Sequence, residues 1–178
     1  MSPETAREIA DELAAGDSAD LGLSLAERTL LYGFRRMASG GDQCPATRRE
    51  FAAALGPLAE DALAAFRCFF WTLAAFGRRR LVVGFPGAGT VSRDERLLLV
   101  VFAAAQADEP GRLCAHLRLL AGGADHRFLA ASATVVAKSL AAAGHRLTLP
   151  APIRPAETAC AQLALTSFCK LRSPSGRG

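Results

Sequence analysis

Seven arginines in three short clusters are the residues of this sequence best suited to bind a charged ligand. A guanidinium group is always charged, and its five N–H donors match the paired oxygens of a phosphate or a carboxylate. The clusters are Arg35 and Arg36; Arg48 and Arg49; and Arg78, Arg79 and Arg80. One hypothesis is therefore a nucleic-acid-binding regulator that uses these side chains.

The same clusters also have a structural interpretation. Arg35–Arg36 and Arg78–Arg80 stand where two predicted helices end, and cations there complement the partial negative charge of a helix C-terminus. The predicted helix over 58–76 is also too apolar and aromatic to enter a DNA groove, which requires a polar face. We therefore place nucleic-acid binding second to protein binding.

A glycine-rich stretch over 84–90, GFPGAGT, follows three apolar residues and precedes a predicted helix. This order resembles the P-loop of nucleotide-binding proteins, in which backbone N–H groups surround the phosphates, a lysine neutralises them and a Ser or Thr holds magnesium. Here Thr90 stands at the lysine position and Val91 at the Ser/Thr position. We interpret the stretch as a turn before a capped helix, and a degenerate nucleotide-binding protein is the third functional hypothesis.

Cysteine and histidine spacing predicts neither a metal site nor a catalytic centre. The five cysteines include no CxxC pair and are at least nine residues apart: Cys44, Cys68, Cys114, Cys160 and Cys169. Cys114 and His116 fall on one predicted helix, where their side chains would point about 200° apart. We expect free thiols in the cytoplasm, no metal, no cofactor and no catalytic residue, which argues against an enzyme.

Charge is distributed unevenly along the chain. The net charge is +4, yet residues 1–22 carry six acids against Arg7, and the rest of the chain is strongly basic. This acidic N-terminal arm lacks the apolar core of a secretory signal. The phenylalanine-rich segment is interrupted by Arg67 and is shorter than the roughly 20 residues that a membrane span needs, so we expect no membrane insertion.

Periodicity and capping signals predict helices along most of the chain. Two capping boxes, Ser24 with Glu27 and Ser92 with Glu95, each precede an apolar periodic segment. Further helices are expected over 3–15, 45–55, 58–76, 110–120 and 125–142. The predicted fold is an all-α orthogonal bundle of about six or seven helices, with at most one short β-hairpin near residues 80–91.

Two of these helices are expected to form the interior. The segment 58–76 carries large apolar residues at helical spacing: Phe66, Phe69, Phe70, Leu73 and Phe76. The segment 97–105 is apolar on every side, which is typical of a fully buried helix. The residues from Ser24 to Phe34 also match those from Ser92 to Phe102 at an offset of 68. Either a helical unit is duplicated, or two capping boxes each precede an amphipathic helix.

The predicted domain organisation is a helical core over 1–149, which includes the acidic arm, and then a proline-rich tether over 150–155. A C-terminal helix over 156–171 and a disordered tail over 172–178 follow. This helix carries Leu163, Leu165 and Phe168, through which it would dock on its own core or on a second copy. The leading functional hypothesis is a non-enzymatic helical interaction or regulatory module that binds a protein partner or self-associates.

Overall fold

The computed structural model describes residues 22–41, 43–122 and 126–148, and within them every regular element is helical. The elements are α2 (Leu25–Ala38), α3 (Pro45–Leu55), the 3₁₀ turn η2 (Gly56–Leu58), α4 (Ala59–Phe76), α5 (Arg93–Gln106), α6 (Pro110–Ala121) and α7 (Arg127–Ala142). The predicted all-α class is confirmed, whereas the total number of helices and their orthogonal packing stay predictions. The expected helix over 3–15, the tether, the C-terminal helix and the tail lie outside the described residues.

Both predicted capping boxes are present. The Ser24 backbone N–H donates to Glu27 Oε2 at 2.8 Å, and the Glu27 N–H donates to Ser24 Oγ at 3.3 Å. The same exchange joins Ser92 and Glu95 at 2.7 and 3.1 Å. These bonds satisfy N–H groups that a helix start otherwise leaves without partners, and they fix where α2 and α5 begin.

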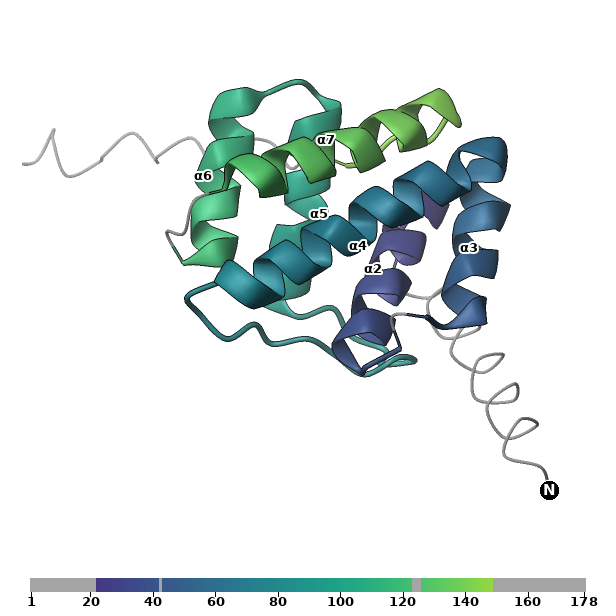
Figure 1. Cartoon of the computed structure of the whole chain (residues 1–178), viewed down its shortest axis with the longest axis horizontal. Helices are drawn as coiled ribbons and strands as arrows, with labels where there is room; N and C mark the ends of the chain where they lie inside the picture. The colour runs from purple at the N-terminus through teal and green to yellow at the C-terminus, as the bar shows by residue number, and fades with distance from the viewer. Residues whose placement is uncertain (1–21, 42, 123–125, 149–178) are drawn as a thin grey trace, which may run out of the picture.

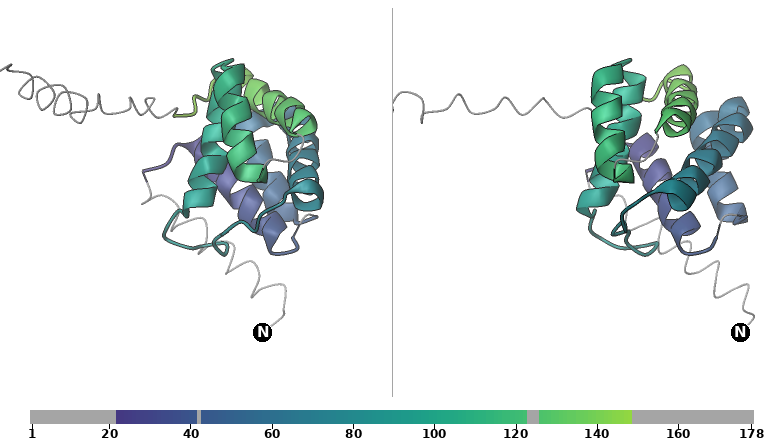
Figure 2. Two further views of the ribbon diagram at one scale, coloured as in Figure 1. Left: turned by 90° about the vertical axis from the view of Figure 1, so that its left-hand side faces the viewer. Right: turned by 60° about the vertical axis from the view of Figure 1, so that its left-hand side comes forward.

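The helices pack in two layers. Figure 1 shows α4 and α7 side by side across the front of the molecule, with α2 and α5 behind them. α3 closes one side of the bundle and α6 closes the other, and the turned views of Figure 2 show the same arrangement. The end of α4 and the start of α5 are joined by a long connection that runs along one end of the bundle.

Aromatic rings from three helices meet in the core. The Phe66 ring of α4 lies 5.3 Å from Phe51 of α3 and 5.8 Å from Phe102 of α5, between ring centroids. Phe69 adds a further contact with Phe102 at 5.0 Å. All four side chains are buried. The two segments predicted to form the interior, 58–76 and 97–105, are thus in contact through these rings.

The apolar stripe predicted for α4 is wrong at its last residue. Phe76 is 66% exposed, although its spacing from Phe66 matched the helical pattern. At about 100° per residue, ten residues turn a side chain roughly 80° away from the starting direction, which is the edge of the buried face. Trp71 points further out and is 53% exposed.

The connection over 77–92, which we call the α4–α5 loop, contains no strand, so the hairpin considered for 80–91 does not form there. Side chains from the start of α5 bind the backbone groups that a strand ladder would need. Asp94 Oδ2 accepts from the Val82 N–H at 2.8 Å, and Ser92 Oγ donates to the Val82 carbonyl at 2.5 Å. The loop is extended but paired with side chains rather than with another strand.

The described helices fall into two series of similar lengths. The helices α2, α3 and α4 have 14, 11 and 18 residues, and α5, α6 and α7 have 14, 12 and 16. Each capping glutamate also accepts from the segment after a third helix: Glu95 from Gly84 at 3.0 Å and Glu27 from Thr148 at 3.3 Å. The two series therefore share helix lengths and this hydrogen bond, while duplication itself stays a hypothesis.

Two glycines should respond oppositely to alanine. A Cβ on Gly33 of α2 would lie 3.0 Å from ring atoms of both Phe51 and Phe66, whereas one on Gly111 of α6 would meet nothing within 4 Å. We expect Gly33→Ala to destabilise by about 1–3 kcal/mol through overpacking. Gly111→Ala should stabilise by about 0.5–1 kcal/mol through helix propensity. Urea unfolding measures both, and equal stabilisation by the two changes would contradict the close approach of α2 to these rings.

Candidate functional site

An ion pair between Arg35 of α2 and Glu95 of α5 lies inside the molecule beneath the α4–α5 loop. The Arg35 side chain is 2% exposed and that of Glu95 is 0% exposed. Arg35 Nε donates to Glu95 Oε1 at 2.7 Å, and Nη2 donates to Oε2 at 3.1 Å. A buried pair of this kind is stable only where further hydrogen bonds satisfy both charged groups.

Those further hydrogen bonds come from the α4–α5 loop. Arg35 donates to the carbonyls of Ala88 at 2.8 Å and Thr90 at 2.6 Å. Glu95 accepts from the backbone N–H groups of Gly84 and Ser92. Burial alone would raise the pKa of Glu95, but the hydrogen bonds from Arg35 and these two N–H groups outweigh it and hold the pKa below its ordinary value. Both charges of the pair therefore hold the loop.

In the glycine-rich stretch that resembles a P-loop, backbone N–H and carbonyl groups form hydrogen bonds with the side chains of Arg35 and Glu95. The Gly84 N–H faces Glu95, and the Ala88 and Thr90 carbonyls face Arg35. A Cβ on Gly84 would lie 3.2 Å from Arg35 Nη2 and from the Ala88 Cβ. A side chain here would therefore crowd Arg35 and Ala88, and glycine favours the close approach of the loop backbone to Arg35.

A second carboxylate, Asp94, ties the start of the same loop to α5. Its Oδ1 is paired with the Arg79 guanidinium and its Oδ2 accepts from Val82. Burial acts to raise the pKa of Asp94, and the Val82 N–H and Arg79 more than compensate, so that its pKa is lowered. Arg79 also donates to the Leu120 carbonyl at 3.2 Å, and the Arg78 N–H donates to Ala121 at 2.9 Å. The loop therefore joins the start of α5 to the end of α6.

These bonds bring six exposed arginines to one end of the bundle. We call them the arginine surface: Arg78, Arg79 and Arg80 of the loop, Arg93 and Arg96 of the first turn of α5, and Arg118 of the last turn of α6. The two carboxylates in the first turn of α5, Asp94 and Glu95, are buried and already bound to arginine. Positive charge therefore dominates this surface.

Three of these arginines were not predicted from the sequence. Arg93 and Arg96 flank Asp94 and Glu95, so this segment has no net charge in the sequence. Because the two acids are buried, only its two arginines are exposed at the surface. The helix dipole does not explain cations at the start of α5, where it favours anions. Arg118 is isolated in the sequence and joins the cluster only because the end of α6 binds Arg78 and Arg79.

The other predicted binding arginines lie elsewhere. Arg35 is in the core, out of reach of a ligand on the surface. Arg36 donates to Cys44 Sγ at 2.9 Å and lies over the Tyr32 ring at 5.9 Å. Arg48 and Arg49 are on α3, across the molecule from α6 in Figure 1, and Arg48 faces Glu60 at 3.5 Å. The predicted interface residues Leu163, Leu165 and Phe168 lie outside the described residues.

The loop that carries three of these arginines also exposes two apolar side chains. Val82 and Phe85 of the α4–α5 loop are 69% and 71% exposed. Both lie within a loop whose backbone is held by the buried ion pair and by Asp94. Exposed apolar groups on a fixed backbone are available for contact with another molecule without prior ordering of the loop.

No family model, curated protein or solved structure matches this chain. Among the residues that the structure describes, no group of three or more His, Cys, Asp or Glu side chains could hold a metal ion. None of the helices described here is long and apolar enough to cross a membrane.

The buried pair should show strong energetic coupling. Arg35→Met and Glu95→Gln should each lower the unfolding free energy by about 3–5 kcal/mol. Each change removes one charge of the pair and leaves the other charge buried without its partner. The double variant should lose at least about 1 kcal/mol less than the sum of the two single losses. Urea unfolding of the four proteins at pH 7 measures this coupling. Strictly additive losses would show that the two side chains act independently.

Acid should weaken the fold through Glu95. Because the folded-state pKa of Glu95 is lowered, its contribution is complete above the ordinary carboxyl pKa of about 4.3 and is lost as the pH falls through the folded value. The unfolding free energy of the unmodified chain should therefore decrease below about pH 4 more steeply than that of Glu95→Gln. Urea midpoints between pH 7 and pH 3 provide the comparison, and parallel pH profiles would contradict the assignment.

Proposed function

We propose that the chain is a non-enzymatic interaction module that binds an acidic segment of a partner protein through the arginine surface and the α4–α5 loop. The observation that carries this proposal is that six exposed arginines from three elements lie at one end of the bundle, on or next to a loop that also exposes Val82 and Phe85. Of the neighbouring acids, Glu95 is paired with the buried Arg35, and Asp94 offsets one of the six, Arg79, so the surface keeps a positive charge.

The mixture of side chains supports a protein partner. Arginine and aromatic residues are enriched where protein interfaces gain most of their binding energy. Arginines recognise carboxylates through paired hydrogen bonds, and Phe85 adds apolar area that a phosphate backbone would not use. The fixed loop backbone lowers the entropy that is lost on binding.

A nucleic acid is the alternative partner. The same six arginines would contact phosphates, and such binding would depend steeply on salt concentration. The two partners differ in their use of Phe85. An acidic protein segment with apolar residues needs Phe85, whereas binding to duplex phosphates does not.

The finer parts of the proposal concern location and assembly. A cytoplasmic location is supported by Cys44, Cys68 and Cys114, which are free thiols. Self-association through the C-terminal segment that carries Leu163, Leu165 and Phe168 is a separate proposal. It would show as a change in molecular mass by light scattering when these three residues are replaced by serine.

Replacing two arginines should separate the partners. We choose Arg78→Ser with Arg80→Ser, since Arg79 also holds Asp94 and Leu120. A labelled 20-residue peptide rich in Glu and Leu should bind the unmodified chain, and the double variant should weaken binding by at least about tenfold, or 1.4 kcal/mol. Fluorescence anisotropy measures the affinity, and a 20-base-pair DNA duplex is the competing probe.

The matched control is Arg48→Ser with Arg49→Ser, which removes the same charge from α3. It should change peptide affinity by less than about threefold, because screening weakens distant surface charges. Phe85→Ser should weaken the peptide and leave the duplex unaffected. If both arginine pairs caused the same loss of peptide affinity, the binding would depend on the net charge of the chain and not on the arginine surface. Tighter duplex binding that is insensitive to Phe85 would favour the nucleic-acid alternative.

A further inference from the structure

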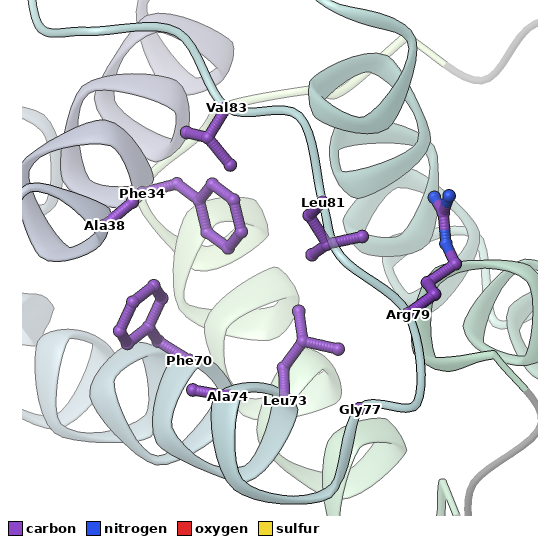
Figure 3. Close-up of a pocket in the computed structure, with 9 residues that line it drawn as sticks. All are labelled: Phe34, Ala38, Phe70, Leu73, Ala74, Gly77, Arg79, Leu81 and Val83. Carbon is purple, nitrogen blue, oxygen red and sulfur yellow. The ribbon is translucent and has the colours of Figure 1, made fainter.

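A cavity of about 210 Å³ lies between α2, α4 and the α4–α5 loop. Figure 3 shows Phe34 of α2 and Phe70 and Leu73 of α4 around this space, with Leu81 and Val83 of the loop opposite them. The Phe34 and Phe70 rings meet edge to face, with centroids 5.6 Å apart. The walls are therefore aromatic and aliphatic.

The loop contributes to the cavity because its backbone is extended there. Leu81 and Val83 line the cavity, while Val82 between them is 69% exposed. This alternation is the pattern of an extended chain with one face against the bundle. The bonds from Val82 to Asp94 and from Gly84 to Glu95 fix it. The cavity wall is thus held by the same polar network as the arginine surface.

The charged group at the cavity is already bound elsewhere. Arg79 lies at the rim, and Figure 3 shows its guanidinium pointing away from the phenylalanine rings. It is paired with Asp94 and donates to Leu120. A charged ligand would leave part of its hydration shell without gaining a counter-ion from the lining, so the lining favours an uncharged molecule.

We propose that this cavity binds a small uncharged molecule built around an aromatic ring. An apolar cavity of about 150 Å³ is large enough to take up benzene, and this cavity, which is partly open to solvent, is larger. The two phenylalanine rings offer edge and face contacts to a third ring. This proposal goes beyond the proposed protein partner, because the cavity lies on the inner side of the loop and shares with the arginine surface only Arg79, whose guanidinium points away from the rings.

Two small residues that line the cavity are exposed to solvent, Ala38 of α2 and Ala74 of α4. A larger side chain at either position would fill part of the cavity from its solvent side without entering the buried core. Ala75 is the neighbour of Ala74 on the same helix, is also exposed and does not line the cavity. It therefore provides a matched control.

The test is a thermal-shift titration of the full chain with benzene and with indole. At ten times its dissociation constant, a bound probe should raise the Tm by about 4 °C. Ala74→Leu should reduce this shift by at least half, Ala75→Leu should retain it, and Ala38→Leu repeats the test from the opposite wall. Chemical-shift changes at Phe34, Leu81 and Val83 should accompany the thermal shift.

Three outcomes would overturn the proposal. The first is the absence of any shift in the unmodified chain, and the second is the same shift in the Ala74 and Ala75 variants. The third is a shift that appears only after Phe168→Ser, which would make the C-terminal segment of the chain itself the occupant. If Ala74→Leu fails to fold, the thermal shift of Ala38→Leu is compared with that of Ala75→Leu instead.

Discussion

The buried ion pair of Arg35 and Glu95 is the constraint on which the rest of this end of the molecule depends. Neither charge can be left without its partner in the core, because each would then lack compensation for its lost hydration. The α4–α5 loop supplies that compensation through Gly84, Ala88 and Thr90. A glycine-rich connection of sixteen residues therefore takes one conformation without any strand pairing.

One loop conformation creates two different surfaces. Its outer side presents Arg78, Arg80 and Val82 to solvent, while its inner side places Leu81 and Val83 against α2 and α4. The alternation of side chains along an extended backbone explains why charged and apolar functions lie so close together. A change that loosens the ion pair should affect both surfaces, whereas a change on one side of the loop should affect only that side.

The sequence was sufficient for the helices that the structure describes and for most of the aromatic core, because capping boxes and helical spacing depend on nearby residues. The sequence did not predict which charged side chains are buried and which are exposed. Arg35 and Arg36 are neighbours that looked alike, yet one is in the core and the other contacts Cys44 and Tyr32. The surface arginines Arg93 and Arg96 were missed because Asp94 and Glu95 between them balance their charge in the sequence. The burial of the two acids depends on contacts with α2 and with the loop. Such long-range pairing leaves no periodic signal in one sequence.

Amide hydrogen exchange in Arg35→Met tests the central claim most directly, because it reports the loop and the helices separately. If the ion pair holds the loop, the Val82, Gly84 and Ala88 amides should exchange at least about tenfold faster than in the unmodified chain under conditions where the α4 and α7 amides stay protected. Unchanged exchange in the loop, or equal acceleration throughout the bundle, would contradict the claim that the pair acts through the loop.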